Sequence, residues 1–109
     1  MDAESQTRLA HNQAMFREVN EGIQRGHCPG DEGAPVGFRC ECAQIGCNTI
    51  VSLPARDYER IRGHPRWFLV MPGHELDELE KVVERGPGYS VVEKEAEAGQ
   101  IASVTDPRN

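Results

Sequence analysis

The sequence predicts an α+β fold in which an N-terminal helix precedes a small β-β-α-β-α-β domain. Three observations carry this prediction: apolar residues at helical spacing near the start, an alternating stretch followed by a turn, and a continuous apolar run in the middle of the chain. The length of 109 residues is that of one domain. We expect an N-terminal helix over 1–26, a loop over 27–35, a metal-binding α+β domain over 36–94 and a flexible tail over 95–109.

The first predicted element is a helix over 3–25. Apolar residues recur there at steps of three and four, with one polar member, and form a single seam: Leu9, Asn12, Phe16, Val19 and Ile23. Gly26 suits the end of such a helix. The seam covers only about two heptads, which favours docking on the rest of the domain over self-pairing in a coiled coil.

A hairpin and a second helix are predicted next. Residues 36–42 alternate between apolar and polar side chains as a strand does, and 48–53 form a second short strand, so 42–47 would be the turn between them. Pro54 suits the first turn of a helix that continues through Arg62, and Gly63 suits its end.

The central apolar run, Trp67–Met71, is predicted to be the most buried strand. Pro72 and Gly73 end it. We expect a helix over 74–85, because its apolar residues have helical spacing and Gly86-Pro87-Gly88 follows, and then a last strand over 89–94. After residue 95 only Ile101 and Val104 are sizeable apolar residues, which predicts the flexible tail.

Charge and composition restrict the classes of partner. The net charge of −6 disfavours nucleic acid and anionic membranes, although four arginines within 56–66 form a local basic patch. No apolar run is long enough to span a membrane, and the first residues lack the apolar core of a signal peptide. We therefore expect a cytoplasmic protein, where clustered cysteines bind metals more often than they form disulfides.

Three cysteines in eight positions, Cys40, Cys42 and Cys47, form the main chemical feature of the chain. Alternation in a strand would place Cys40 and Cys42 on one side, and Gly46 would let the chain curl so that Cys47 closes on them. Thiolates in such a loop bind Zn²⁺ as part of a tetrahedral site. One zinc ion would then hold this small domain together. An iron–sulfur cluster is the second metal option, because thiolates with a histidine also hold [2Fe–2S] clusters.

The fourth ligand has several candidates: His27, Cys28, His64 and His74. His74 is favoured because it follows the buried strand and the Pro72-Gly73 turn, where a ligand is held rigidly. Cys28 lies in a predicted loop, and its ordering on a metal would cost entropy. The predicted site is therefore Cys40, Cys42, Cys47 and His74.

These motifs resemble those of a family of small, functionally uncharacterised, mostly actinobacterial proteins. The shared pattern comprises F-x-C-x-C-x4-C, then VSLPARDYERIR, FLVMPGHELDELEKVVE and YSVVEK, and it extends from about Arg8 to Lys94. The resemblance implies that the three cysteines and His74 belong together. Cys28 lies outside the shared pattern. The resemblance implies no particular activity.

The motifs favour a non-enzymatic protein. A zincin needs a second histidine where Glu78 stands, and the zinc deaminase pattern lacks its C-x-x-C. The first hypothesis is a zinc-stabilised interaction or regulatory module that docks onto another protein. A nucleic-acid-associated zinc protein that uses the basic patch, with Arg56, Arg60, Arg62, His64 and Arg66, is one alternative. The other alternative is a small iron–sulfur protein, or a redox protein in which a disulfide such as Cys40–Cys42 forms. The sequence leaves the oligomeric state open.

Overall fold

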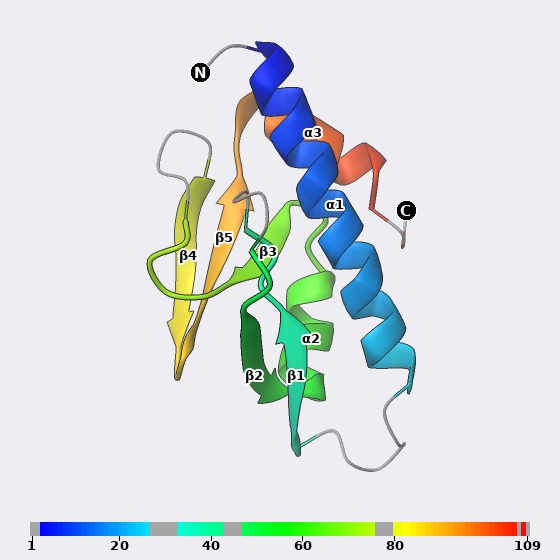
Figure 1. Cartoon of the computed structure of the whole chain (residues 1–109), viewed down its shortest axis with the longest axis vertical. Helices are drawn as coiled ribbons and strands as arrows, with labels where there is room; N and C mark the ends of the chain where they lie inside the picture. The colour runs from blue at the N-terminus through cyan, green and yellow to red at the C-terminus, as the bar shows by residue number, and fades with distance from the viewer. Residues whose placement is uncertain (1–2, 27–32, 43–46, 76–79, 107, 109) are drawn as a thin grey trace.

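The protein has the α+β architecture that the sequence predicts (Figure 1). The computed structural model describes residues 3–26, 33–42, 47–75, 80–106 and 108, and for 3–12 and 96–98 it describes the backbone alone. In chain order the elements are α1 (Ala3–Gly26), β1 (Pro35–Arg39), β2 (Ile50–Pro54), α2 (Ala55–Arg62), β3 (Trp67–Val70), β4 (Glu80–Gly86), β5 (Tyr89–Lys94) and α3 (Ala96–Val104).

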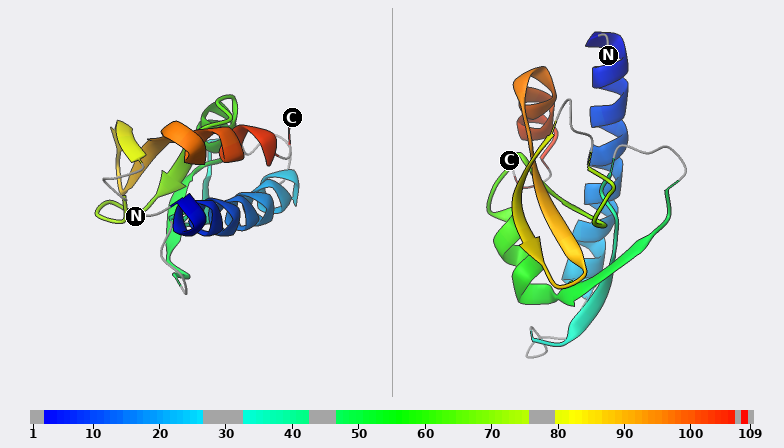
Figure 2. Two further views of the ribbon diagram at one scale, coloured as in Figure 1. Left: turned by 90° about the horizontal axis from the view of Figure 1, so that it is seen from above. Right: turned by 90° about the vertical axis from the view of Figure 1, so that its left-hand side faces the viewer.

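The strands form two antiparallel sheets. Strands β1 and β2 make the predicted hairpin, in which Phe38 faces Val51 and Val36 faces Leu53. Strands β3, β5 and β4 make a second sheet with β5 in the centre. In Figure 1, α1 runs along the opposite side of the molecule from β4, and Figure 2 shows α3 lying beside α1, against which it packs.

The core lies between the hairpin, α2 and the β3-β5-β4 sheet. Its largest apolar members are fully buried, and the rings of Phe38 and Tyr58 stack with their centroids 4.3 Å apart. Alternation explains the hairpin's contribution, since Phe38, Val51 and Leu53 point inward while Gly37 and Ser52 are exposed. Helix α2 contributes Tyr58 and Ile61, which lie on one helical face.

The predicted helix over 74–85 is wrong wherever its residues are described, because residues 74–75 are not helical and residues 80–85 belong to a strand. Residues 80–86 form strand β4, which pairs with β5 and carries a register irregularity between Val82 and Glu84. Adjacent β-branched valines suit a strand better than a helix. Pro87 and Gly88 are the two residues between the strands, and Gly88 has a φ of 74°, which suits the second central position of a tight turn. Residues 76–79 lie outside the described residues.

The flexible tail expected over 95–109 contains a helix instead. Helix α3 packs against α1 and β5, and Ala102 is buried in the core. Small residues that give a weak apolar signal in sequence allow this close packing. Asp106, just after α3, pairs with the buried guanidinium of Arg62, which fixes the end of this segment to α2.

Helix α1 forms as predicted but turns a different face to the body. Gln13, Arg17 and Asn20 are fully buried, whereas Val19, a member of the predicted apolar seam, is 48% exposed. Only Ile23 of the seam is described as packing against the core. The side chains of Leu9 and Asn12 lie outside the described part. The surface that receives α1 presents backbone carbonyls and amides, so polar side chains rather than apolar ones satisfy it.

Among the helices in these described ranges, none has both the length and the apolar content that crossing a membrane requires.

Candidate metal centre

The ends of three strands bring the site together. Cys40 and Cys42 follow β1, Cys47 precedes β2, and His74 follows β3. Beyond β1 the chain turns toward the edge of β3, where the amide of Glu41 donates to the carbonyl of Leu69 at 2.7 Å. Strand alternation therefore ends at β1, and the following residues run beside a different strand.

A tight turn after β3 positions the histidine. The amide of His74 donates to the carbonyl of Met71 at 2.9 Å, and Gly73 in this turn has a φ of 91°, in the region that glycine adopts without strain. The amide of Met71 donates to Cys40 Sγ at 3.2 Å. This turn therefore carries both His74 and a donor for one of the thiols.

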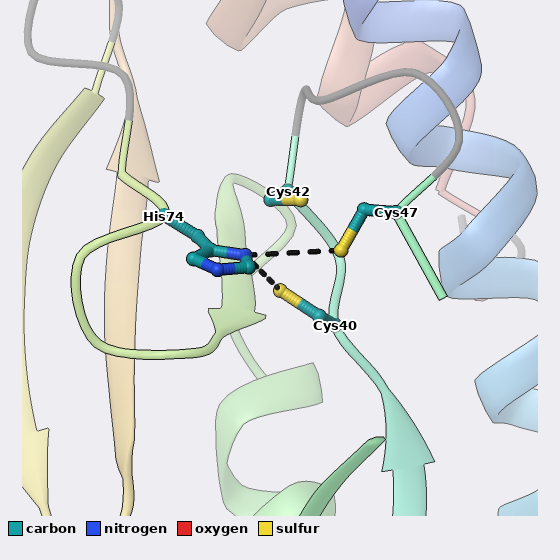
Figure 3. A group of neighbouring side chains, drawn as sticks. All are labelled: Cys40, Cys42, Cys47 and His74. Carbon is teal, nitrogen blue, oxygen red and sulfur yellow. Dashed lines mark hydrogen bonds between the residues drawn. The ribbon is translucent and has the colours of Figure 1, made fainter. Parts of the chain in front are cut away.

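The four side chains converge on one point (Figure 3). Cys40 Sγ lies 3.6 Å and Cys47 Sγ lies 3.7 Å from His74 Nδ1. The ligand atoms of the Cys3His cluster, meaning Cys40, Cys42, Cys47 and His74, all lie within 4.8 Å of one another. No disulfide joins any two of these three cysteines.

These spacings match those of a tetrahedral metal site. With Zn–S bonds of about 2.3 Å and Zn–N bonds of about 2.0–2.1 Å, tetrahedral angles place sulfur about 3.6 Å from nitrogen and about 3.8 Å from a second sulfur. The observed distances of 3.6 and 3.7 Å from the two sulfurs to His74 Nδ1 fit this geometry.

The thiols of the cluster differ in burial and in the direction of their pKa shifts. Cys40 and Cys42 are buried, while Cys47 and His74 are half-buried and form the outer side of the cluster. Burial raises the pKa of Cys40. Burial also works against ionisation of Cys47, yet the pKa of this thiol is lowered to about 6. Hydrogen bonds from the backbone and hydroxyl of Thr49, from Cys42 and from His74 outweigh its burial.

The structure thus brings together the four residues that the sequence singled out. His64, another candidate for the fourth ligand, lies elsewhere and stacks on Trp67 with ring centroids 3.6 Å apart. His27 and Cys28 lie outside the described residues.

Sequence reasoning missed the polar network behind the cluster. Glu41, between the two buried cysteines, is itself fully buried and accepts hydrogen bonds from Tyr58 Oη at 2.6 Å and Asn20 Nδ2 at 2.7 Å. The amide of Leu69 donates to its other carboxylate oxygen at 2.8 Å. Burial raises the pKa of Glu41 against these hydrogen bonds. The one sequence signal for a role of Glu41 was its position between Cys40 and Cys42. Strand alternation alone would place its side chain in solvent.

The two hollows described on the surface lie away from the cluster. One, of about 310 Å³, is lined by Pro35, Ser52, Leu53, Pro54, Asp57, Pro87 and Tyr89. The other, of about 260 Å³, is lined by His64, Pro65, Arg66, Trp67, Glu93 and Ser103. Neither includes a residue of the Cys3His cluster, so neither places a bound molecule against it.

Comparison with known protein families, with curated proteins and with solved structures finds no match for this chain.

Proposed function

We propose that the protein binds one Zn²⁺ through the Cys3His cluster and acts as a non-enzymatic interaction or regulatory module. The observation that carries the metal site is the convergence of four donor atoms within 4.8 Å of one another, from segments up to 34 residues apart. The ion would join the hairpin of β1 and β2 to the turn after β3.

Zinc fits this donor set better than the alternatives. Soft thiolates with one imidazole favour zinc or iron–sulfur clusters over Mg²⁺ or Ca²⁺. A two-iron cluster shares its ligands between two metal atoms and would spread them further than donors that converge on one point. A thiol redox pair remains the second alternative, with Cys47, the thiol of lowered pKa, as its most reactive member.

A non-enzymatic role follows from the ligand count. Four protein ligands fill a tetrahedral zinc ion, and catalysis needs an open position for water or substrate. The resemblance noted in the sequence adds no activity. We therefore expect the zinc ion to stabilise the fold, and the folded, cytoplasmic module to act by docking onto another protein.

Nucleic acid has less support as a partner. Within the basic patch, Arg62 is buried against Glu21 and Asp106, and Arg60 forms a bidentate pair with Glu84. Arginines that are already paired with carboxylates of the same chain add little to a phosphate-binding face. Titration of labelled duplex DNA and RNA at increasing salt tests this alternative: tight binding that weakens steeply with salt would favour it over a protein partner.

Metal analysis tests the site itself. The reduced, full-length chain should carry one zinc per molecule by elemental analysis and native mass spectrometry. Cys47→Ser and His74→Ala should lose most of it, because each removes one of four ligands. His64→Ala and Cys28→Ser are matched controls that should keep it. A chain without bound metal, or full zinc retention in His74→Ala, would contradict the proposed ligand set.

A further inference from the structure

Helix α1 is attached to the very segment that carries two of the proposed zinc ligands. Asn20 pairs with both backbone groups of Arg39: its Nδ2 donates to the carbonyl at 2.8 Å, and its Oδ1 accepts from the amide at 2.7 Å. Asn20 therefore satisfies the backbone at the end of β1 much as a neighbouring strand would. The next residue along the chain is Cys40.

A second side chain of α1 reaches the same segment. Gln13 Nε2 lies 3.1 Å from the carbonyl oxygen of Glu41 and 2.8 Å from Glu80 Oε2. Gln13 and Asn20 are both fully buried. The helix thus holds the peptide between Cys40 and Cys42 from one side, where a zinc ion would hold the two sulfurs from the other.

Glu41 connects these contacts to the rest of the fold. Its carboxylate accepts from Asn20 on α1, from Tyr58 on α2 and from the amide of Leu69 on β3. Hydrogen bonds weaken steeply when donor and acceptor turn away from each other. A rotation of the backbone at Glu41 would therefore break contacts to α1, α2 and β3 together.

We propose that metal occupancy of the Cys3His cluster controls the docking of α1. This inference rests on the proposed zinc site. With zinc bound, Cys40 and Cys42 are fixed on both sides of Glu41, so the acceptors for Gln13 and Asn20 stand in the required positions. Loss of zinc frees both sulfurs, and the segment can rotate away from those donors. Because linkage is reciprocal, a docked α1 also raises the affinity for zinc by the same factor.

The nature of the interface makes α1 the element most sensitive to this change. Its buried face is polar, and the described apolar side chain that packs on the core is Ile23. An interface of directional hydrogen bonds loses more from a small rotation than an apolar one does. Arg17 holds α1 independently, through the carbonyls of Pro65 and Ala102 at 2.6 Å each. Loss of the Gln13 and Asn20 contacts should therefore open α1 locally rather than unfold the whole protein.

Hydrogen exchange on the full-length, reduced chain tests the inference. Amide protection is measured by mass spectrometry with Zn²⁺ bound and after removal by a chelator. We expect protection across α1 to fall about tenfold or more on zinc removal, while β3 and β5 keep most of theirs. Unchanged protection of α1 after verified zinc loss would overturn the inference and leave the zinc site standing, and so would equal loss in every element. Absence of bound zinc would overturn the zinc site and this inference with it.

Zinc affinity provides an independent measurement, because Asn20→Ala removes three contacts to the segment without touching a ligand. Competition with a chromophoric chelator should show binding of Zn²⁺ about tenfold weaker than in the wild type. Val19→Ala, on the exposed face of the same helix, should leave it unchanged. Equal affinity in the wild type and both variants would overturn the coupling. If Asn20→Ala does not fold, the exchange experiment on the wild-type chain decides.

Discussion

Replacing Lys94 with methionine should strongly destabilise the protein, because it leaves the carboxylate of Glu80 buried without its cation. The two side chains form an ion pair with exposures of 1% and 0%. Glu80 and Lys94 are direct partners across β4 and β5, and Glu80 also accepts from Gln13 on α1. This pair therefore joins the edge strand to both the central strand and the helix. Burial lowers the pKa of Lys94, which shows that the ammonium is desolvated.

The size of the loss follows from burial. Removing one partner of a buried ion pair costs about 3–5 kcal/mol, against a total stability of about 5–15 kcal/mol for a domain. At roughly 4–8 °C per kcal/mol, a loss of about 4 kcal/mol lowers the melting temperature by roughly 16–32 °C. Replacing both partners, as in Lys94→Met with Glu80→Leu, should recover much of this, because the uncompensated charge is gone.

Urea unfolding followed by Trp67 fluorescence measures the effect. Free zinc must be held constant, since a ligand of the native state shifts apparent stability. Lys81→Met is the matched control: it removes an exposed lysine from the neighbouring strand β4, next to Glu80, and should change stability by no more than about 0.5 kcal/mol. A value for Lys94→Met within about 1 kcal/mol of this control would refute the reasoning from the buried pair.

Two further predictions concern stability. Arg60 lowers the pKa of Glu84, so the pair stabilises the protein above pH 4.5 and loses this effect as Glu84 is protonated at lower pH. Arg60→Met should thus cost about 0.5 kcal/mol at pH 7, and the difference from the wild type in urea melts should vanish in acid; a constant difference would contradict this. Gly99→Ala should lower the melting temperature, because its Cβ would lie 2.8 Å from the carbonyl oxygen of Lys94. Gly22→Ala should raise the melting temperature instead, because its Cβ would lie 3.8 Å from the guanidinium of Arg25 and alanine has about 1 kcal/mol more helix propensity than glycine. Equal effects of the two substitutions would exclude the steric explanation.

The sequence predicted the centre of this protein well. The hairpin, the buried strand β3 and helix α2 follow from short-range signals, namely alternation, an apolar run and a proline at a helix start. The cluster of cysteines was recognisable for the same reason, since three of its members lie within eight residues. His74 was the harder member, and its position after a rigid Pro-Gly turn was the signal that identified it.

Errors arose where a segment's structure depends on its neighbours. The spacing of apolar residues before Gly86 suits a helix, yet Val82 pairs with Val92 in a sheet because β5 offers an open edge. Residues 96–104 carry little apolar signal and form a helix that is held by packing on α1 and β5.

By itself, the sequence determined the class of fold and the identity of a four-residue cluster, because local periodicity and cysteine chemistry do not need the rest of the chain. Only the tertiary structure decided which face of α1 is buried and what Glu41 does. Those outcomes depend on backbone groups of β1, β3 and the segment after β1 that must find hydrogen-bond partners. Only the folded chain shows where these groups stand, and Asn20, Gln13 and Glu41 are the side chains that satisfy them.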